Sequence, residues 1–146
     1  MQEAVANLGQ ETAMRAIIIS GDHLDDIENI MSKVQSTLTA NECVQLANIN
    51  SQSQVVLSGT ADGVDKACSI LQAKGWAGRA VDLPVSAPFH CELMRPAEVP
   101  MKRAFEKVLF KKTIIPVISN VTALPVRFHK LWFDGVCLFS TAPCVF

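Results

Sequence analysis

The 146-residue sequence lacks the motif that most often presents a nucleophilic serine. A Gly-x-Ser-x-Gly elbow, in which a sharp strand-to-helix turn exposes the hydroxyl, occurs nowhere in these residues. A histidine that acts as a general base needs such a nucleophile to activate. The sequence therefore contains at most the base half of a nucleophile–base pair of this kind.

Metal-binding and redox motifs are also missing. The cysteines form no Cys-x-x-Cys pair, and the three histidines are scattered, so we expect no metal site and no cofactor. The number of cysteines is odd and the sequence shows no signal peptide, which predicts reduced intracellular thiols rather than a disulfide framework. The five cysteines are Cys43, Cys68, Cys91, Cys137 and Cys144.

Charge is scarce, and no apolar run is long. Charged residues make up 18% of the chain and the net charge is −1, which disfavours a nucleic-acid partner. Pro, Gly or charged residues interrupt every apolar stretch before it could span a bilayer, so we expect no membrane insertion. Apolar residues make up 49%, which predicts one folded domain rather than a disordered chain. A mean hydropathy of +0.26 suggests surface that packs on another protein segment.

The first half of the chain alternates between strand and helix patterns. Apolar runs predict strands over 13–19, 43–49, 54–57 and 77–83. Leu24, Ile27, Met31 and Val34 recur at helical spacing after a turn at 20–22, with Asp22 as the expected N-cap.

A second helix is expected to begin at Thr60 and to end at Gly75. The polar link at 50–53 is short enough to make the strands on either side an antiparallel hairpin. The resulting order, β-α-β-β-α-β, predicts a ferredoxin-like subdomain over residues 12–84. Such a fold has two helices on one face of a four-stranded antiparallel sheet.

One histidine stands out after this unit. His90 follows the Pro-broken run that begins at Leu83, and it precedes a helix-like segment that starts at Glu92. Loops held by rigid elements often aim a catalytic side chain, although a single histidine is more often a packed or surface residue. The adjacent Cys91 is interpreted as a small buried hydrophobe, since sequence neighbours do not face each other on a helix or strand.

The remaining elements are too few for a second core. Helical periodicity predicts a helix mainly over 96–110, and an apolar run predicts a strand over 114–120 with Pro116 near its beginning. Residues 127–146 are rich in Phe but show no clear period. We interpret this segment as an aberrant or unrelated tail, from a frameshift, intron read-through or alternative exon. A short apolar strand pair is the alternative.

Four segments together resemble a known family. They are 1–5 (MQEAV), 48–51 (NINS) with 54–59 (QVVLSG), 83–90 (LPVSAPFH), and 117–121 (VISNV). Their order and spacing resemble the malonyl-CoA:acyl carrier protein transacylases of fatty-acid synthesis, over residues 1 to about 126.

This resemblance implies a large α/β-hydrolase-like subdomain, partly represented by 1–11 and 85–126, into which the ferredoxin-like one is inserted. It implies that His90 is the catalytic histidine. It also implies that Asn50 lines the same cleft, and that Ser86 and Phe89 shape the approach to the histidine. The expected partners are malonyl-CoA and acyl carrier protein.

The departures from the family pattern limit what this chain can do. The family's nucleophilic serine, and the arginine that pairs with the malonyl carboxylate, are expected upstream of Met1. We therefore expect malonyl transferase ancestry without independent activity, because no acyl-enzyme forms without the serine.

Two other roles stay open at this stage. One is a non-catalytic binding or interaction module, since a ferredoxin-like fold alone does not determine whether a protein is an enzyme or a binding module. In that role Lys74 and Arg79 could meet acidic carrier protein, unless they are ordinary solvated charges. The other is a truncated product that does not fold stably.

The compartment is expected to be intracellular. It would be the mitochondrial matrix if the parent is a free-standing eukaryotic enzyme, although the sequence shows no transit peptide. The oligomeric state cannot be derived from the sequence.

Overall fold

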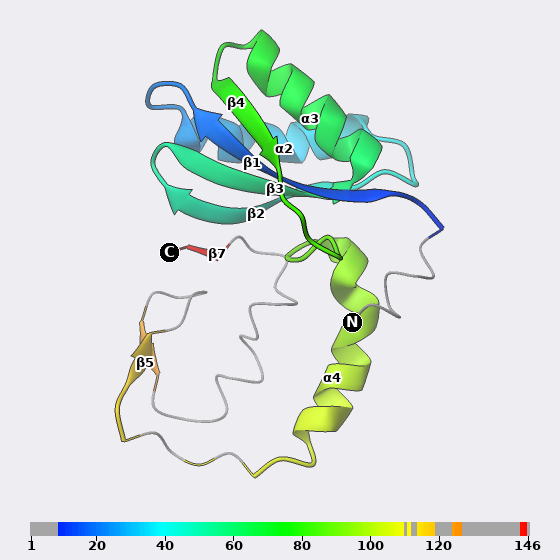
Figure 1. Ribbon diagram of the computed structural model, residues 1–146, viewed down its shortest axis with the longest axis vertical. Coiled ribbons are helices and arrows are strands. Elements are labelled where there is room, and N and C mark those ends of the chain that lie inside the picture. Colours follow the sequence, from blue (N-terminus) through cyan, green and yellow to red (C-terminus); the bar gives the residue numbers. More distant parts are fainter. Residues whose placement is uncertain (1–8, 110, 112–113, 119–123, 127–143, 146) are drawn as a thin grey trace.

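The computed structural model describes residues 9–109, 111, 114–118, 124–126 and 144–145 (Figure 1). Its first six elements follow the predicted β-α-β-β-α-β order. They are β1 (Thr12–Ile19), α2 (Leu24–Thr37), β2 (Val44–Ser51), β3 (Gln54–Thr60), α3 (Ala61–Ala73) and β4 (Ala77–Asp82). The apolar runs and helical spacings of the sequence are thus sufficient to locate each of them.

These four strands form one antiparallel sheet in the order β4-β1-β3-β2. The prediction of four antiparallel strands is therefore confirmed for this part of the sheet. A fifth strand, β7 (Cys144–Val145), was not predicted, and it extends the sheet by pairing parallel to β2 at Asn48 and Ile49. Such a short partner carries little sequence signal, because two residues cannot display a period.

Helices α2 and α3 cover one face of this sheet (Figure 1). Their apolar faces and the inward side chains of the strands enclose the main core. Its larger members include Ile17, Ile27, Val34, Val55, Leu57, Val64 and Leu71. Each of these side chains is at most 3% exposed, and fully burying one such side chain stabilises the fold by about 1.5–3 kcal/mol.

The ends of α3 agree with the sequence prediction. The Thr60 side chain accepts a hydrogen bond from the backbone N–H of Gly63 at 3.2 Å, so it caps the helix. Gly75 follows the last turn with φ +73°, a conformation that glycine adopts without steric cost.

The start of α2 differs from the prediction. His23, not Asp22, is the N-cap, and no side chain hydrogen-bonds the first free amides of this helix. The imidazole Nδ1 of His23 instead pairs with Asp26 Oδ2 at 2.9 Å. Asp25 and Asp26 lie in the first turn, where carboxylates interact favourably with the helix dipole.

The β2–β3 hairpin is antiparallel as predicted, but its strands are longer. Asn50 and Ser51 belong to β2 rather than to the connection, and β3 continues to Thr60. Ser51 pairs with Gln54, so the turn itself is confined to Gln52 and Ser53.

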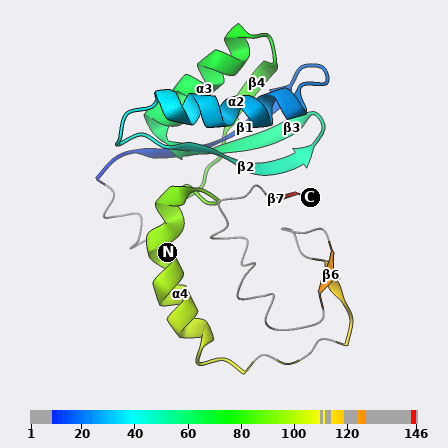
Figure 2. The ribbon, with the colours of Figure 1, turned by 180° about the vertical axis from the view of Figure 1, so that it is seen from behind.

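The chain then crosses to the face of the sheet opposite α2 and α3 (Figure 2). A 3-10 helix, η1 (Glu92–Ala97), leads into α4 (Glu98–Phe105). The predicted helix over 96–110 is thus shorter, and a 3-10 turn precedes it. Pro96 lies inside η1, where its ring disfavours an α-helical start, while Pro100 is tolerated in the first turn of α4.

The remaining described elements form a small two-stranded sheet. Strand β5 (Val117–Ile118) begins directly after Pro116 and pairs with β6 (Pro125–Val126). Residues 119–120 of the predicted strand, and all of 127–146 apart from Cys144 and Val145, lie outside the described residues. None of the eight residues of α4 is buried.

Candidate active site

The segment that carries His90 is fixed to the open face of the sheet. Leu83 donates its backbone N–H to Met14 O of β1 at 2.9 Å. The Leu83 and Phe89 side chains pack on a cluster of Met14, Ala47 and Val56, which come from β1, β2 and β3. The loop is therefore held at both ends by apolar contact with three strands.

A second small cluster fixes the other side of the loop. Ala87, Met94 and Ala97 are buried together, and Phe89 packs against them as well as against the sheet. Pro88 is also fully buried. His90 thus lies between buried residues of the loop and buried residues of η1, although its own side chain is only half-buried.

His90 has an unusual backbone. Its φ is +60°, the only positive φ of a non-glycine residue in the described part of the chain. This left-handed region costs an L-residue roughly 1–2 kcal/mol. Such conformations persist only where surrounding contacts impose them, and they cluster at functional sites.

The other predicted site residues come from two parts of the chain. Phe89 packs near Ala47 of β2, three residues before Asn50. Asn50 is exposed, and its Nδ2 donates to Gln54 Oε1 across the hairpin at 3.0 Å. Ser86 is exposed on the loop. Phe89 and Ser86 therefore belong to the same loop as His90, whereas Asn50 comes from the adjacent strand.

Two contacts behind His90 escaped the sequence analysis. The Cys91 thiol is buried and donates to the Pro88 carbonyl at 3.0 Å. The backbone N–H of Glu92 donates to Gln45 Oε1 of β2. Together they tie the residues on the C-terminal side of His90 to the loop and to the sheet.

Cys91 also has a neighbour that makes it more than a buried hydrophobe. A hydrogen bond from the Cys43 thiol, which outweighs the opposing effect of burial, lowers the pKa of Cys91 to about 7. The same hydrogen bond, together with burial, raises the pKa of Cys43. Backbone amides at the start of η1 contribute to the shift at Cys91, as is typical of cysteines that precede a helix. Cys91 directly precedes the helix-like segment that begins at Glu92, and this position was the signal in the sequence for a lowered pKa at Cys91.

One of the two basic residues considered for carrier-protein contact, Lys74, has a local partner. The Lys74 ammonium lies 4.7 Å from the centre of the Trp76 ring, and the His23 ring stacks on the same indole at 5.3 Å. Lys74 therefore takes part in a cation–π contact, worth about 0.5–1 kcal/mol at an exposed site. Arg79 is exposed on β4.

A groove of about 380 Å³ lies between α2 and β2. None of the four predicted site residues lines it. Its walls are Glu28, Met31, Ser32, Gln35, Val44, Gln45 and Leu46.

Within the described residues, no group of three His, Cys, Asp or Glu side chains could hold a metal ion. The described helices also include none that is long and apolar enough to cross a membrane.

Comparison with known proteins identifies related chains. No protein-family model matches. A malonyl CoA-acyl carrier protein transacylase of Bacillus subtilis is 42% identical over 161 aligned positions, which cover 95% of this chain and 48% of that protein. The match thus includes part of 127–146, beyond the residues on which the predicted resemblance rests.

Solved structures give the same relationship. The crystal structure of FabD from Acinetobacter baumannii is 29% identical with a TM-score of 0.80, over 98% of this chain and 44% of that one. A malonyl-transacylase in complex with a type II polyketide acyl-carrier protein is 28% identical with a TM-score of 0.79, over 98% and 45%. The chain spans about half the length of the relatives it matches. The resemblance predicted from the four sequence segments is confirmed.

Proposed function

Because the chain is related to part of the malonyl CoA-acyl carrier protein transacylases, we propose that it supplies the histidine-bearing part of such an enzyme. The reaction would be malonyl transfer from malonyl-CoA to the phosphopantetheine thiol of acyl carrier protein. The observation that carries the proposal is the His90 loop. It holds a half-buried imidazole in a left-handed conformation between two buried clusters.

In this proposal His90 is the general base and acid. Its imidazole takes the proton from a serine hydroxyl as the oxygen attacks the malonyl thioester, and it returns that proton to the departing coenzyme A thiol. In the second half-reaction it takes the proton of the carrier thiol, which attacks the seryl ester, and it returns the proton to serine. The 146 residues contain no Gly-x-Ser-x-Gly motif, so the chain by itself is expected to be inactive.

Three further residues would shape the same site. Phe89 is proposed to fix the loop, which its packing in both clusters supports. Ser86 and Asn50 are proposed to lie along the approach to His90. Their exposure is compatible with that role, and Asn50 is held in place by Gln54.

We propose the domain limits as follows. Residues 12–84 would be a ferredoxin-like subdomain, which the strand order β4-β1-β3-β2 with both helices on one face supports. Residues 1–11 and 85–126 would belong to a large α/β-hydrolase-like subdomain. The aberrant origin of 127–146 stays a prediction, to be weighed against the length of the Bacillus subtilis match, and transcript sequencing across this region tests it.

We propose an intracellular location because the structure shows Cys43, Cys68 and Cys91 as free thiols, which are typical of reducing compartments. The relatives reported above that are named with an organism are bacterial, so they give no support to the mitochondrial alternative.

Fragment complementation tests the proposal. The 146-residue chain is mixed with the serine-bearing part of the Bacillus subtilis relative, and malonyl-CoA and holo acyl carrier protein are added. Intact mass spectrometry should detect malonyl carrier protein with both fragments present and none with either alone. The His90→Ala chain should reduce the rate at least about a hundredfold, as loss of a general base does. The matched control is Lys107→Ala, on the exposed turn after α4.

Two results would overturn the proposal. One is undiminished transfer with His90→Ala. The other is binding of the two fragments without any transfer. The second result would favour the alternative function, a non-catalytic interaction module. Chemical-shift changes at Lys74 and Arg79 on adding carrier protein would support that alternative, and their absence at millimolar carrier would end it.

A further inference from the structure

The His90 loop is attached to one row of the sheet at both of its ends. The backbone N–H of Leu83 donates to Met14 O of β1 at 2.9 Å, and the backbone N–H of Glu92 donates to Gln45 Oε1 of β2. Met14 and Gln45 are paired with the same residue of β3, so they lie in one row across three strands. Two strand spacings separate them, so the sheet fixes the span of the loop at about 10 Å.

The two attachments differ in kind. The bond at Met14 joins two backbones, so it does not depend on either side chain. The bond at Gln45 depends on one side-chain carbonyl. This side chain lies on the loop side of the sheet, because the neighbouring Val44 and Leu46 belong to the main core on the other side. A substitution of Gln45 can therefore release one end of the loop alone.

The end of the loop that follows His90 is attached to the sheet through Gln45. Cys91 is the N-cap of η1, but its side chain makes no capping hydrogen bond. Gln45 thus supplies, from a strand, the acceptor that an N-cap side chain normally supplies. The buried residues of η1, Met94 and Ala97, pack in a cluster with the loop itself. Helix α4, which follows, has no buried residue and extends away from the sheet (Figure 1).

The left-handed residue of the loop lies close to this attachment. His90 has φ +60°, and the Glu92 amide is only two residues further along the chain. Cys91 between them is extended, with φ −136° and ψ 168°. The fixed position of the Glu92 amide therefore limits the backbone angles open to residue 90. Once that amide is released, residue 90 can relax toward a negative φ, which redirects its side chain.

We propose that Gln45 is a positioning residue for His90. Its side-chain carbonyl holds the first amide of η1, which keeps the backbone of residue 90 in the left-handed region and aims the imidazole. Gln45 acts through His90 rather than on the substrate. The effect on malonyl transfer rests on the proposed function, whereas the effect on the backbone of residue 90 can be measured without any reaction.

Gln35 provides a matched control in the same part of the fold. Gln35 Oε1 of α2 accepts from the backbone N–H of Val44 at 2.9 Å, so it is also a glutamine whose carbonyl holds one backbone amide. Both glutamines line the groove beside β2. Gln45→Met and Gln35→Met each remove one such acceptor while keeping a long unbranched side chain. Only the first change should affect His90.

Hydrogen exchange and NMR of the intact 146-residue chain test the bond and the backbone separately. In the unchanged chain the Glu92 amide should be protected. Residue 90 should give a strong cross-peak between its amide proton and its Hα, because these two protons lie closest at a φ near +60°. Gln45→Met should weaken that cross-peak and accelerate exchange at Glu92 about tenfold, as the loss of one hydrogen bond does. Gln35→Met should accelerate exchange at Val44 and leave both signals of the loop unchanged.

Gln45→Glu is the conservative variant, because it keeps an oxygen at the same position. It should recover the protection at Glu92 and the cross-peak at residue 90. The Glu92 carboxylate is paired with Arg95 Nη2 at 2.8 Å, which reduces its repulsion of the new charge. In the complementation assay Gln45→Met should lower kcat about tenfold with KM unchanged, since a misaligned imidazole weakens the transition state rather than substrate binding. Gln45→Glu should recover most of this rate.

Four results would overturn the proposal. They are an unprotected Glu92 amide in the unchanged chain, an undiminished cross-peak at residue 90 in Gln45→Met, an equal loss of that cross-peak in Gln35→Met, and undiminished transfer by a Gln45→Met chain whose residue 90 has relaxed. If Gln45→Met does not fold, Gln45→Asn replaces it, because its oxygen stops one methylene short of the Glu92 amide. If no chain transfers malonyl in the assay, the proposed function fails, and the exchange and cross-peak results still decide whether Gln45 holds the loop.

Discussion

The backbone of His90 gives the most direct test at the scale of a single residue. His90→Gly and His90→Ala both remove the imidazole and its contacts, so they differ only in how well the new residue tolerates φ +60°. Alanine retains the left-handed cost of about 1–2 kcal/mol, whereas glycine loses about 0.5–1 kcal/mol through unfolded-chain entropy. We therefore expect the glycine variant to be the more stable of the two, by about 0.5–1 kcal/mol.

Urea unfolding of the two variants at one pH measures this difference. The comparison cancels every interaction of the side chain, so a more stable alanine variant would mean that the backbone at residue 90 is not held in the left-handed region.

The Cys91 thiol predicts a pH dependence of stability. Its folded-state pKa is lowered from 9.0 to about 7, so its thiolate stabilises the folded state at high pH, and this contribution is lost as the pH falls from 9 toward 7. The free energy of unfolding should then rise by about 1 kcal/mol between pH 7 and 8.5 relative to the Cys91→Ser chain. The raised pKa of Cys43 acts in the opposite direction only above its ordinary value of 9.0.

Urea titrations of the unchanged, Cys91→Ser and Cys68→Ser chains at both pH values check the prediction. Cys68→Ser should retain the rise, because burial raises the pKa of Cys68. Parallel pH curves for all three chains would contradict a lowered pKa at Cys91.

Among the secondary-structure elements, α3 has the most specific start. Thr60 Oγ1 accepts from Gly63 N and from Cys43 N, so one hydroxyl satisfies amides of a helix and of the residue before β2. Thr60→Ala removes the cap and leaves a partly buried amide unpaired, which should lower the free energy of unfolding by about 2 kcal/mol.

Thr60→Ser should recover most of this loss, because serine supplies the same oxygen. Ser69→Ala is the matched control in the same helix. Its hydroxyl donates to Asp65 O on the exposed side, so the change should stay within about 0.5 kcal/mol. Equal losses for Thr60→Ala and Ser69→Ala in thermal or urea unfolding would contradict the capping role.

The elements that the sequence predicted well share a physical property. β1 and α3 have long apolar patterns that only one secondary structure can bury, and Thr60 and Gly75 supply local signals for the ends of α3. The helix predicted over 96–110 begins two residues later, at Glu98, because Pro96 favours a 3-10 turn there, and it ends earlier, at Phe105. β7 was missed because two residues pair through the backbone of β2, which a sequence pattern does not report.

The candidate site also combines residues that local sequence signals predict with contacts that they do not predict. His90 was singled out from a local motif, whereas Phe89 was implied by the family resemblance, and Phe89 packs in both clusters beside His90. The contacts of Gln45 and Cys43 with the loop were missed, because they join residues more than forty positions apart in the chain. Long-range contacts of this kind depend on the register of the sheet, which the residue types alone do not determine.

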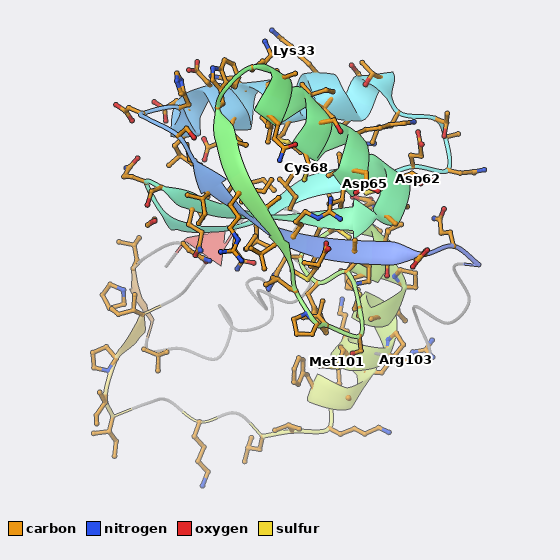
Figure 3. The ribbon with its side chains drawn as sticks, turned by 45° about the horizontal axis from the view of Figure 1, so that its top comes forward. Lys33, Asp62, Asp65, Cys68, Met101 and Arg103 are labelled. Atoms are coloured by element: carbon orange, nitrogen blue, oxygen red, sulfur yellow. The ribbon has the colours of Figure 1, made fainter. Side chains whose placement is uncertain are left out.

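On the scale of the whole molecule, apolar exposure is concentrated after α4. Leu109 is 84% exposed, Ile114 94% and Ile115 76%, whereas the exposed apolar residue Val81 on β4 is only 41% exposed. None of the eight residues of α4 is buried, and its Met101 and Arg103 lie on the side of the sheet away from α3 (Figure 3). Large apolar side chains exposed to this extent normally pack on another protein surface.

The extent of the relatives indicates what covers this surface in a complete enzyme. The chain covers 48% of the Bacillus subtilis relative and 44% of the Acinetobacter baumannii one, so the rest of such a protein is available to pack on α4 and the segment after it. The α2–α3 side has its own core and needs no such partner. The 146 residues by themselves should therefore self-associate through the α4 side while the sheet remains folded.

Ile114→Ser combined with Ile115→Ser should weaken this self-association. Burying an isoleucine side chain contributes about 1.5–3 kcal/mol, so losing two should raise the dissociation constant at least about tenfold even if burial is only partial. The unfolding free energy should hardly change, because neither side chain belongs to a core cluster. Val81→Thr, on strand β4 and outside the segment after α4, should leave the association unchanged.

Sedimentation velocity over a concentration series, with urea unfolding of the same three chains, separates the possibilities. Equal weakening by Val81→Thr would locate the contact on the sheet rather than on the α4 side. A chain that stays monomeric at every concentration would mean that the apolar surface is covered within the 146 residues. In that case the serine-bearing fragment would have no exposed surface here to bind, and complementation would have to proceed through the open face of the sheet instead.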